Sequence, residues 1–160
     1  MKGIKGRAES VPTGRDFSII IDYAHTPDGL KNILSTFRDC KKNRLIVLFG
    51  CGGDRDKTKR PIMGNIAVRY ADYVIVTSDN PRSENPTEII KDILVGTDGV
   101  NTPVKVIENR IEAIKYAVSI AKTDDIIVLA GKGHETYQIL ADKTIHLDER
   151  EVVDEALKAL

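Results

Sequence analysis

The 160-residue sequence contains no tryptophan and only two cysteines, and aromatic residues make up 5% of its length. Lysine plus arginine number 24, as do aspartate plus glutamate, so neither sign of charge is in excess. Without a positive field or stacking aromatics, the composition argues against a nucleic-acid partner. The longest apolar runs, such as 45–49 and 126–130, fall short of the roughly 18 residues that a membrane-spanning helix needs. We therefore expect no nucleic-acid and no membrane partner.

The cysteines and the first residues indicate the compartment. Cys40 and Cys51 fit no metal-binding spacing, and the sequence shows no zinc-like pattern of Cys, His and Asp. The basic residues at 1–10 lack the apolar stretch of a secretory signal peptide. We predict a cytoplasmic protein with two reduced thiols and no metal site in this chain. A disulfide or redox pair is the alternative.

Short apolar runs alternate with helical segments along the chain. Predicted strands cover 17–22, 44–49, 73–77, 104–107 and 125–130. Predicted helices cover 27–40, 60–70, 86–94, 110–121 and the residues from 149 onward. This alternation predicts an α/β, Rossmann-like domain, with a mostly parallel sheet flanked by helices on both faces. A hairpin is expected over 136–147, a boundary strand or hinge over 1–10, and a single domain over 1–160.

Residues with a preference for helix N-termini precede the predicted helices. Thr26 stands before Pro27, a favourable residue in a first helical turn. Asn85, Asn109 and Asp148 are each followed three residues later by glutamate, the pattern of a capping box. These positions predict where four of the helices begin.

Polar loops follow four of the predicted strands. They read DYAHTP from position 22, GCGGDRDK from 50, SDNPR from 78 and GKGHE from 131. The carboxyl ends of parallel strands meet at one edge of a sheet, where ligands bind in folds of this class. Glycine and proline that merely end a strand would explain one such loop, but four loops with charged or imidazole groups predict a binding site.

The glycine-rich loop at 50–57 completes neither common nucleotide-binding motif. Arg55 stands where a dinucleotide fingerprint needs its third glycine, and Cys51 and Asp56 stand where a P-loop needs glycines. We therefore expect no nucleotide-hydrolysing P-loop in this chain. The basic residues of the loop could hold a carboxylate or phosphate, or could simply be exposed residues that open a helix.

The charges of the loops predict the kind of ligand. An arginine binds a carboxylate through two parallel hydrogen bonds, and a buried carboxylate needs a cation to offset its desolvation. Arg55 and Arg82 beside Glu135 therefore suit a zwitterion such as an amino acid, and Asn80 could add a donor and an acceptor.

Other polar residues of the loops suggest no catalytic group or metal ligand. His25 and His134 could act as general bases, but a histidine in a turn is more often a hydrogen-bonding group. Asp22, Asp54 and Asp79 could touch magnesium, but turn or salt-bridge roles are more common. We therefore assign no catalytic residue to the chain.

Five motifs, in this order, resemble those of the Mur ligase family, most closely its UDP-N-acetylmuramoyl-tripeptide synthetase type. They are GRAE at 6–9, DYAHTPD at 22–28, FGCGGDRDKTKRP at 49–61, TSDNPR at 77–82 and GKGHE at 131–135. The likeness covers nearly the whole chain. The sequence departs from the family at two places, both outside the main loops. Asn109 stands where family members often have Asp, and Leu147-Asp148-Glu149 stands where Phe-Asp-Asp is common.

The resemblance implies an ATP-dependent ligase of peptidoglycan synthesis, of which this chain is the C-terminal domain. The N-terminal UDP-binding domain and the central ATPase domain would be absent, and magnesium would be held mainly by the latter. In the family, ATP phosphorylates a carboxylate of UDP-N-acetylmuramoyl-L-alanyl-D-glutamate, and the incoming amine attacks the acyl phosphate. By the likeness, Arg7, Asp22 and His25 would meet ATP. The isolated chain is expected to be inactive.

The likeness also assigns the incoming amino acid to Arg55, Asn80, Arg82, Gly131 and Glu135. It favours meso-diaminopimelate, because Arg82 could hold the carboxylate at the far end of that ligand while Glu135 takes the ammonium. L-lysine has no second carboxylate for Arg82. Three alternatives stay open: a relative using lysine or a sulfur-containing analogue, a stand-alone amino-acid-binding module, and an unrelated nucleotide-binding protein.

Overall fold

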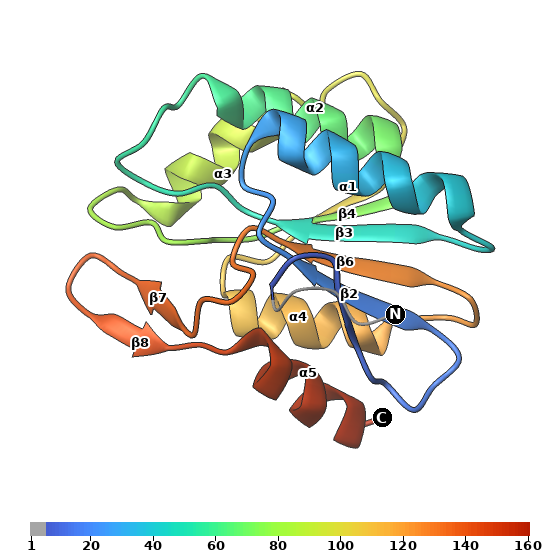
Figure 1. Cartoon of the computed structure of the whole chain (residues 1–160). Helices are drawn as coiled ribbons and strands as arrows, with labels where there is room; N and C mark the ends of the chain where they lie inside the picture. The colour runs from blue at the N-terminus through green and yellow to red at the C-terminus, as the bar shows by residue number, and fades with distance from the viewer. Residues whose placement is uncertain (1–5) are drawn as a thin grey trace.

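The computed structural model describes residues 6–160, and their strands form one six-stranded sheet and a separate hairpin (Figure 1). The sheet order is β1-β2-β6-β3-β4-β5. The strands of the sheet are β1 (Glu9–Val11), β2 (Ser18–Asp22), β3 (Leu45–Phe49), β4 (Tyr73–Val76), β5 (Val104–Val106) and β6 (Ile126–Ala130). Only β1 runs antiparallel to its neighbour. The predicted α/β class and mostly parallel sheet are confirmed.

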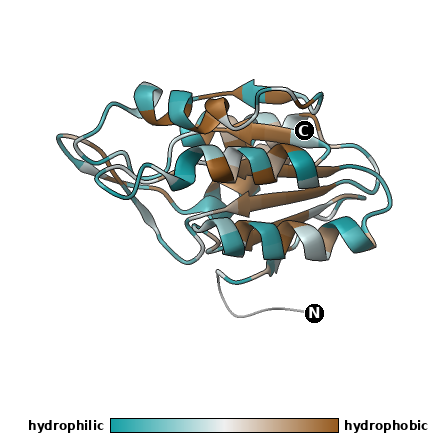
Figure 2. Ribbon diagram, turned by 90° about the horizontal axis from the view of Figure 1, so that it is seen from above, coloured by the Kyte–Doolittle hydropathy of each residue, from teal (hydrophilic) through white to brown (hydrophobic). Residues whose placement is uncertain are grey.

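Helices cover both faces of the sheet (Figure 1). One face carries α1 (Pro27–Cys40), α2 (Lys59–Tyr70) and α3 (Pro86–Val95), and the other carries α4 (Arg110–Ser119) and α5 (Glu149–Lys158). Side chains of one strand alternate between the two faces of the sheet. In β3, Val47 therefore packs in the core under α1, α2 and α3, whereas Ile46 and Leu48 pack in the core under α4 and α5. Figure 2 shows the apolar strands enclosed between helices whose outer faces are hydrophilic.

The predicted helix starts are confirmed at all four capping residues. The Thr26 hydroxyl accepts a hydrogen bond from the main-chain nitrogen of Gly29, at 3.1 Å. The side chains of Asn85, Asn109 and Asp148 likewise accept from main-chain N–H groups two or three residues later, at 2.8 to 3.0 Å. Each bond satisfies a donor that the first turn of a helix leaves without a partner.

The hairpin and the end of α4 lie close to where the sequence predicts them. The hairpin consists of β7 (Tyr137–Ile139) and β8 (Thr144–His146), within the predicted range. Helix α4 ends at Ser119, two residues before the predicted end. A boundary strand was expected over 1–10, and β1 (Glu9–Val11) overlaps the end of that range. Residues 1–5 lie outside the described residues.

Cys40 and Cys51 are free thiols. No helix within residues 6–160 is long and apolar enough to span a membrane.

Candidate functional site

The four polar loops meet at the carboxyl edge of the sheet, as the sequence predicts. They follow β2, β3, β4 and β6, which are consecutive in the sheet although not in the chain. A cavity of about 270 Å³ opens between them. Its lining includes all five residues predicted to bind an amino acid: Arg55, Asn80, Arg82, Gly131 and Glu135.

Two of these loops touch each other through their backbones. The main-chain nitrogen of Gly53 donates to the carbonyl of Asn80 at 2.8 Å. A Cβ atom on Gly53 would lie 1.8 Å from the carbonyl oxygen of Pro81, and one on Gly50 would lie 2.2 Å from that of Thr77. Glycine is therefore required at both positions, because no side chain fits between the loops.

The two arginines of the cavity are partly held by main-chain oxygens. Arg82 has a φ angle of 52°, a left-handed conformation that is rare for arginine and turns its side chain back across the glycine-rich loop. Its Nη1 atom donates to the carbonyl of Gly53 at 3.0 Å. Arg55 is exposed and donates to the carbonyl of Asp54 at 3.0 Å. Both arginines line the cavity.

An ion pair between a buried arginine and a partly buried glutamate supports the loop that carries Arg55. Arg60 is 1% exposed, and its Nη2 atom lies 2.8 Å from Glu84 and 3.1 Å from the carbonyl of Gly52. Glu84 also accepts from the main-chain nitrogen of Asp54. The hydrogen bonds from Arg60 and then from Asp54 lower the pKa of Glu84 from 4.5 to about 2. The carboxylate therefore stays charged and holds the loop in place.

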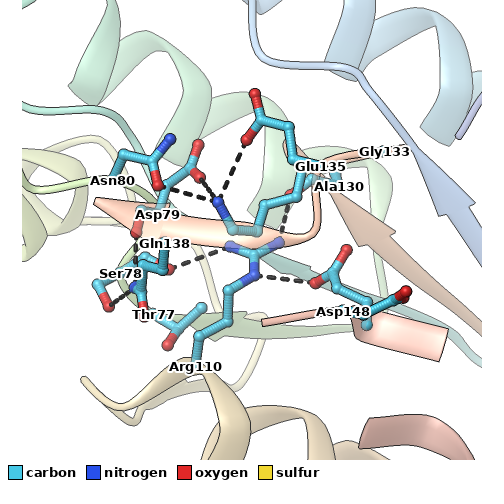
Figure 3. A network of polar contacts seen from close by, with 12 residues as sticks. Thr77, Ser78, Asp79, Asn80, Arg110, Ala130, Gly133, Glu135, Gln138 and Asp148 are labelled. Carbon is cyan, nitrogen blue, oxygen red and sulfur yellow. Dashed lines mark hydrogen bonds and ion pairs between the residues drawn. The ribbon is translucent and has the colours of Figure 1, made fainter. Parts of the chain in front are cut away.

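Lys132 is a residue of the site that the sequence reasoning missed. It is fully buried, and its Nζ atom lies 3.3 Å from Asp79 Oδ1, 3.0 Å from Asn80 Oδ1 and 3.2 Å from Glu135 Oε1. Figure 3 shows the side chains of Asp79, Asn80 and Glu135 turned towards this common point. The available signal was a lysine two residues after the end of an apolar strand, between two glycines.

These contacts narrow what Asn80 can offer a ligand. Its Oδ1 atom accepts from Lys132 and also from the main-chain nitrogen of Ile139 at 3.0 Å. An amide oxygen has two lone pairs, so this acceptor is already used. The side-chain nitrogen of Asn80 remains, since no hydrogen bond within residues 6–160 engages it.

A second ion pair, with both side chains buried, joins the strand ends beneath the cavity. Arg110 and Glu149 are both 0% exposed in their side chains, with Nε and Oε2 2.9 Å apart. The other nitrogens of Arg110 donate to the carbonyls of Ser78 at 3.1 Å and Ala130 at 3.0 Å (Figure 3). Glu149, from a stretch expected to lie outside the main loops, therefore lies directly under two of them, because α4 and α5 pack side by side against the sheet.

The three residues predicted to meet ATP line a second, more open hollow of about 300 Å³, namely Arg7, Asp22 and His25. Both oxygens of Asp22 accept main-chain hydrogen bonds, from Ala8 at 2.6 Å and Ala24 at 2.9 Å. His25 donates from Nδ1 to the carbonyl of Tyr23 at 2.8 Å. Tyr23 and His25 border both hollows, so the two are neighbours.

The aspartates considered for magnesium have protein partners. Asp22 holds the two main-chain amides, Asp79 pairs with Lys132, and Asp54 accepts from the hydroxyl of Ser83 at 2.7 Å. In the described part of the chain, no group of three or more His, Cys, Asp or Glu residues could hold a metal ion. These residues thus do not fit a magnesium site.

Comparison with known proteins identifies the family. The family described as "Mur ligase, glutamate ligase domain" matches residues 6–133. The chain belongs to the Mur ligase family. The match includes all the strands of the six-stranded sheet and the four polar loops up to Gly133.

Individual Mur ligases match the chain over nearly its whole length. A protein of Caldanaerobacter subterraneus named UDP-N-acetylmuramoyl-L-alanyl-D-glutamate--2,6-diaminopimelate ligase is 60% identical over 96% of this chain and 32% of its own length. A Clostridium acetobutylicum protein of the same name, numbered 1, is 59% identical over 100% and 33%. A solved structure of such a ligase matches with a TM-score of 0.92 and 41% identity, over 99% of this chain and 32% of the other. The chain spans about a third of the curated relatives it matches.

Proposed function

We propose that the chain is the amino-acid-binding and ATP-capping C-terminal domain of a cytoplasmic Mur ligase. In this proposal the whole enzyme joins meso-diaminopimelate to UDP-N-acetylmuramoyl-L-alanyl-D-glutamate with ATP. The similar ligases are named for UDP-N-acetylmuramoyl-L-alanyl-D-glutamate and 2,6-diaminopimelate. The observation that carries the proposal is the single cavity that brings Arg55, Arg82 and Glu135 together from three separate loops.

The charges of this cavity match the far end of meso-diaminopimelate. That end has a carboxylate and an ammonium on one carbon atom. In this proposal Arg82 binds the carboxylate, and Glu135 accepts from the ammonium through Oε2, since Oε1 is paired with Lys132. L-lysine would leave Arg82 without its carboxylate, and an unpaired polar group in a site strongly disfavours a ligand.

The contribution of this chain to catalysis would then be positioning. Arg55, Asn80 and Arg82 would fix the amino acid so that its free amine points out of the cavity, towards an acyl phosphate formed on another domain. Holding two reactants in good alignment is worth ~7 kcal/mol or more. Arg7 and His25, in the neighbouring hollow, would contact ATP from the side of this chain.

Calorimetric titration of the chain with meso-diaminopimelate, with L-lysine as the control, tests the proposed ligand. We expect heat of binding from meso-diaminopimelate at concentrations where L-lysine gives none. A sulfur-containing diamino diacid forms a third arm, because its two ends carry the same charges. Binding of L-lysine alone, or of none of the three ligands, would contradict the proposed amino-acid site.

An assay of phosphate release tests the proposed division of labour between domains. The glycine-rich loop of this chain lacks the P-loop pattern, so we expect no release above the blank when ATP, magnesium, meso-diaminopimelate and the UDP-linked substrate are all present. Sustained release would show that the chain activates the substrate by itself, which contradicts the proposal.

A further inference from the structure

Lys132 is more deeply buried than Arg55 and Arg82, the two arginines that line the cavity, and than the two carboxylates with which it pairs. Its side chain is 0% exposed, whereas that of Glu135 is 15% exposed and that of Asp79 is 11% exposed. A buried lysine is stabilised only if acceptors replace its lost water, and here two carboxylates and an amide oxygen do so. The ring of Tyr137 adds a further contact, 5.8 Å from Nζ to its centroid. Because Lys132 is buried beneath these groups, it acts on a ligand only through them.

The charge of the inner cavity depends on this lysine. Asp79 and Glu135 contribute two negative charges, and Lys132 and Arg82 contribute two positive ones, so this set of four side chains, here called the inner cavity, is neutral. Arg55 and Lys59 also line the cavity but do not belong to this set. A neutral group suits a neutral ligand end, one with both a carboxylate and an ammonium. Without Lys132 the same group would carry one net negative charge, which suits an end with an ammonium alone.

We propose that Lys132 is a positioning residue that sets the charge of the inner cavity and thereby selects a zwitterionic ligand end over a cationic one. This inference rests on the proposed function, because it concerns the choice between meso-diaminopimelate and L-lysine. It assigns the selectivity partly to a residue that touches neither ligand. Arg82 provides the direct contact with the carboxylate, and Lys132 prevents Asp79 and Glu135 from attracting a simple cation too strongly.

A double-mutant cycle tests this proposal. Its four forms are the unaltered chain, Lys132→Met, Asp79→Asn and the double variant. Methionine has nearly the length of lysine, and asparagine the shape of aspartate, so charge is the main change. The measurement is the ratio of the dissociation constants of L-lysine and meso-diaminopimelate, by calorimetry. A ratio is used because general loosening of the cavity weakens both ligands together.

We expect Lys132→Met to shift the ratio towards L-lysine by about tenfold, the effect of one unbalanced charge near a partly buried ligand. Asp79→Asn should shift the ratio in the opposite direction, because it leaves one extra positive charge. The double variant is neutral again, and its ratio should return to within about threefold of the unaltered chain, even if both affinities are lower.

The outcomes separate the inference from the proposed function. If the unaltered chain binds neither amino acid, the proposed function fails and the inference fails with it. If the unaltered chain prefers meso-diaminopimelate but the two single variants shift the ratio equally, or in the same direction, Lys132 does not act through charge. If Lys132→Met does not fold, as thermal unfolding would show, the opposite shift in Asp79→Asn and the restored ratio in the double variant still decide the question.

Discussion

The two hollows at the carboxyl edge share Tyr23 and His25 but are built differently. The cavity around Arg82 rests on three buried cations, Lys132, Arg110 and Arg60, each hydrogen-bonded to acidic groups. The hollow around Arg7 is formed by an exposed arginine, an exposed histidine and an aspartate that holds main-chain amides. The first is enclosed by four loops of this chain, whereas the second is the more open of the two.

This difference indicates how the proposed enzyme would divide recognition. A cavity supported by buried ion pairs keeps its shape before the ligand arrives, so less free energy is spent on ordering it. An open wall gains affinity only when a second surface closes over the same ligand. We therefore expect amino-acid recognition to be a property of this chain and ATP recognition to require the other domains.

The largest expected effect comes from breaking the support beneath the cavity. Glu149→Ala would leave Arg110 buried without its carboxylate, and the free energy of unfolding should fall by about 3–5 kcal/mol. Denaturation of the chain in urea measures this. The matched control is Asp154→Ala, which breaks an exposed pair with Lys158 on the same helix and should change little. Equal losses in the two variants would mean that the buried pair does not support the site.

Removing the direct carboxylate contact should have the next largest effect. Arg82→Ala should weaken binding of meso-diaminopimelate by about tenfold or more, because a charged hydrogen-bonding partner is lost, and should affect L-lysine far less. Calorimetry on both ligands measures the difference. Arg38→Ala, an exposed arginine on α1 far from the cavity in the sequence and the fold, serves as the control. Equal weakening of both ligands would contradict the role of Arg82.

Glu84 should lose its stabilising effect on the glycine-rich loop as the pH falls from 4.5 towards 2. The folded-state pKa of Glu84 is about 2 against an ordinary 4.5, so its charge stabilises the fold fully above pH 4.5. That stabilisation is lost as the pH falls through 4.5 towards 2. Unfolding curves of the chain and of Glu84→Gln should therefore converge over this range, whereas Glu88→Gln, at an exposed position, should follow the unaltered chain throughout. If the stability difference between Glu84→Gln and the unaltered chain stayed constant over this pH range, the charge of Glu84 would not stabilise the loop.

The smallest effect is expected in the open hollow. Arg7→Ala removes an exposed side chain, so affinity for meso-diaminopimelate should stay within about twofold and the free energy of unfolding within about 0.5 kcal/mol. The same titrations and urea curves measure both. A clear loss of amino-acid affinity would show that the two hollows are coupled, and the comparison between them would need revision.

The sequence was sufficient to predict the elements and the loops of the site. Runs such as 45–49 and 126–130 are apolar at every position, which is typical of strands covered on both faces, and Thr26 and Asn109 mark helix starts through local hydrogen bonds. Parallel strands place their following loops at one edge whatever the strand order, so Arg82 and Glu135 could be brought together by reasoning alone.

The buried cations could not be predicted in the same way. Lys132 and Asp79 are 53 residues apart, and Arg110 and Glu149 are 39 apart. They meet because β6 lies between β2 and β3 and because α4 packs beside α5, arrangements that no local pattern specifies. Lysine and arginine in a sequence also suggest solvent exposure, since burial of either is rare unless it is paired.

The contact between the loops after β3 and β4 has a consequence for redesign of the proposed amino-acid site. With no room for a side chain at Gly50 or Gly53, a substitution at either position would push the two backbones apart. The contact between the two backbones thus fixes the spacing of Arg55 from Asn80 and Arg82. A new amino-acid preference would therefore have to be introduced by exchanging side chains on an unchanged backbone, which makes this pocket a tractable target for small substitution libraries and a poor one for loop grafting.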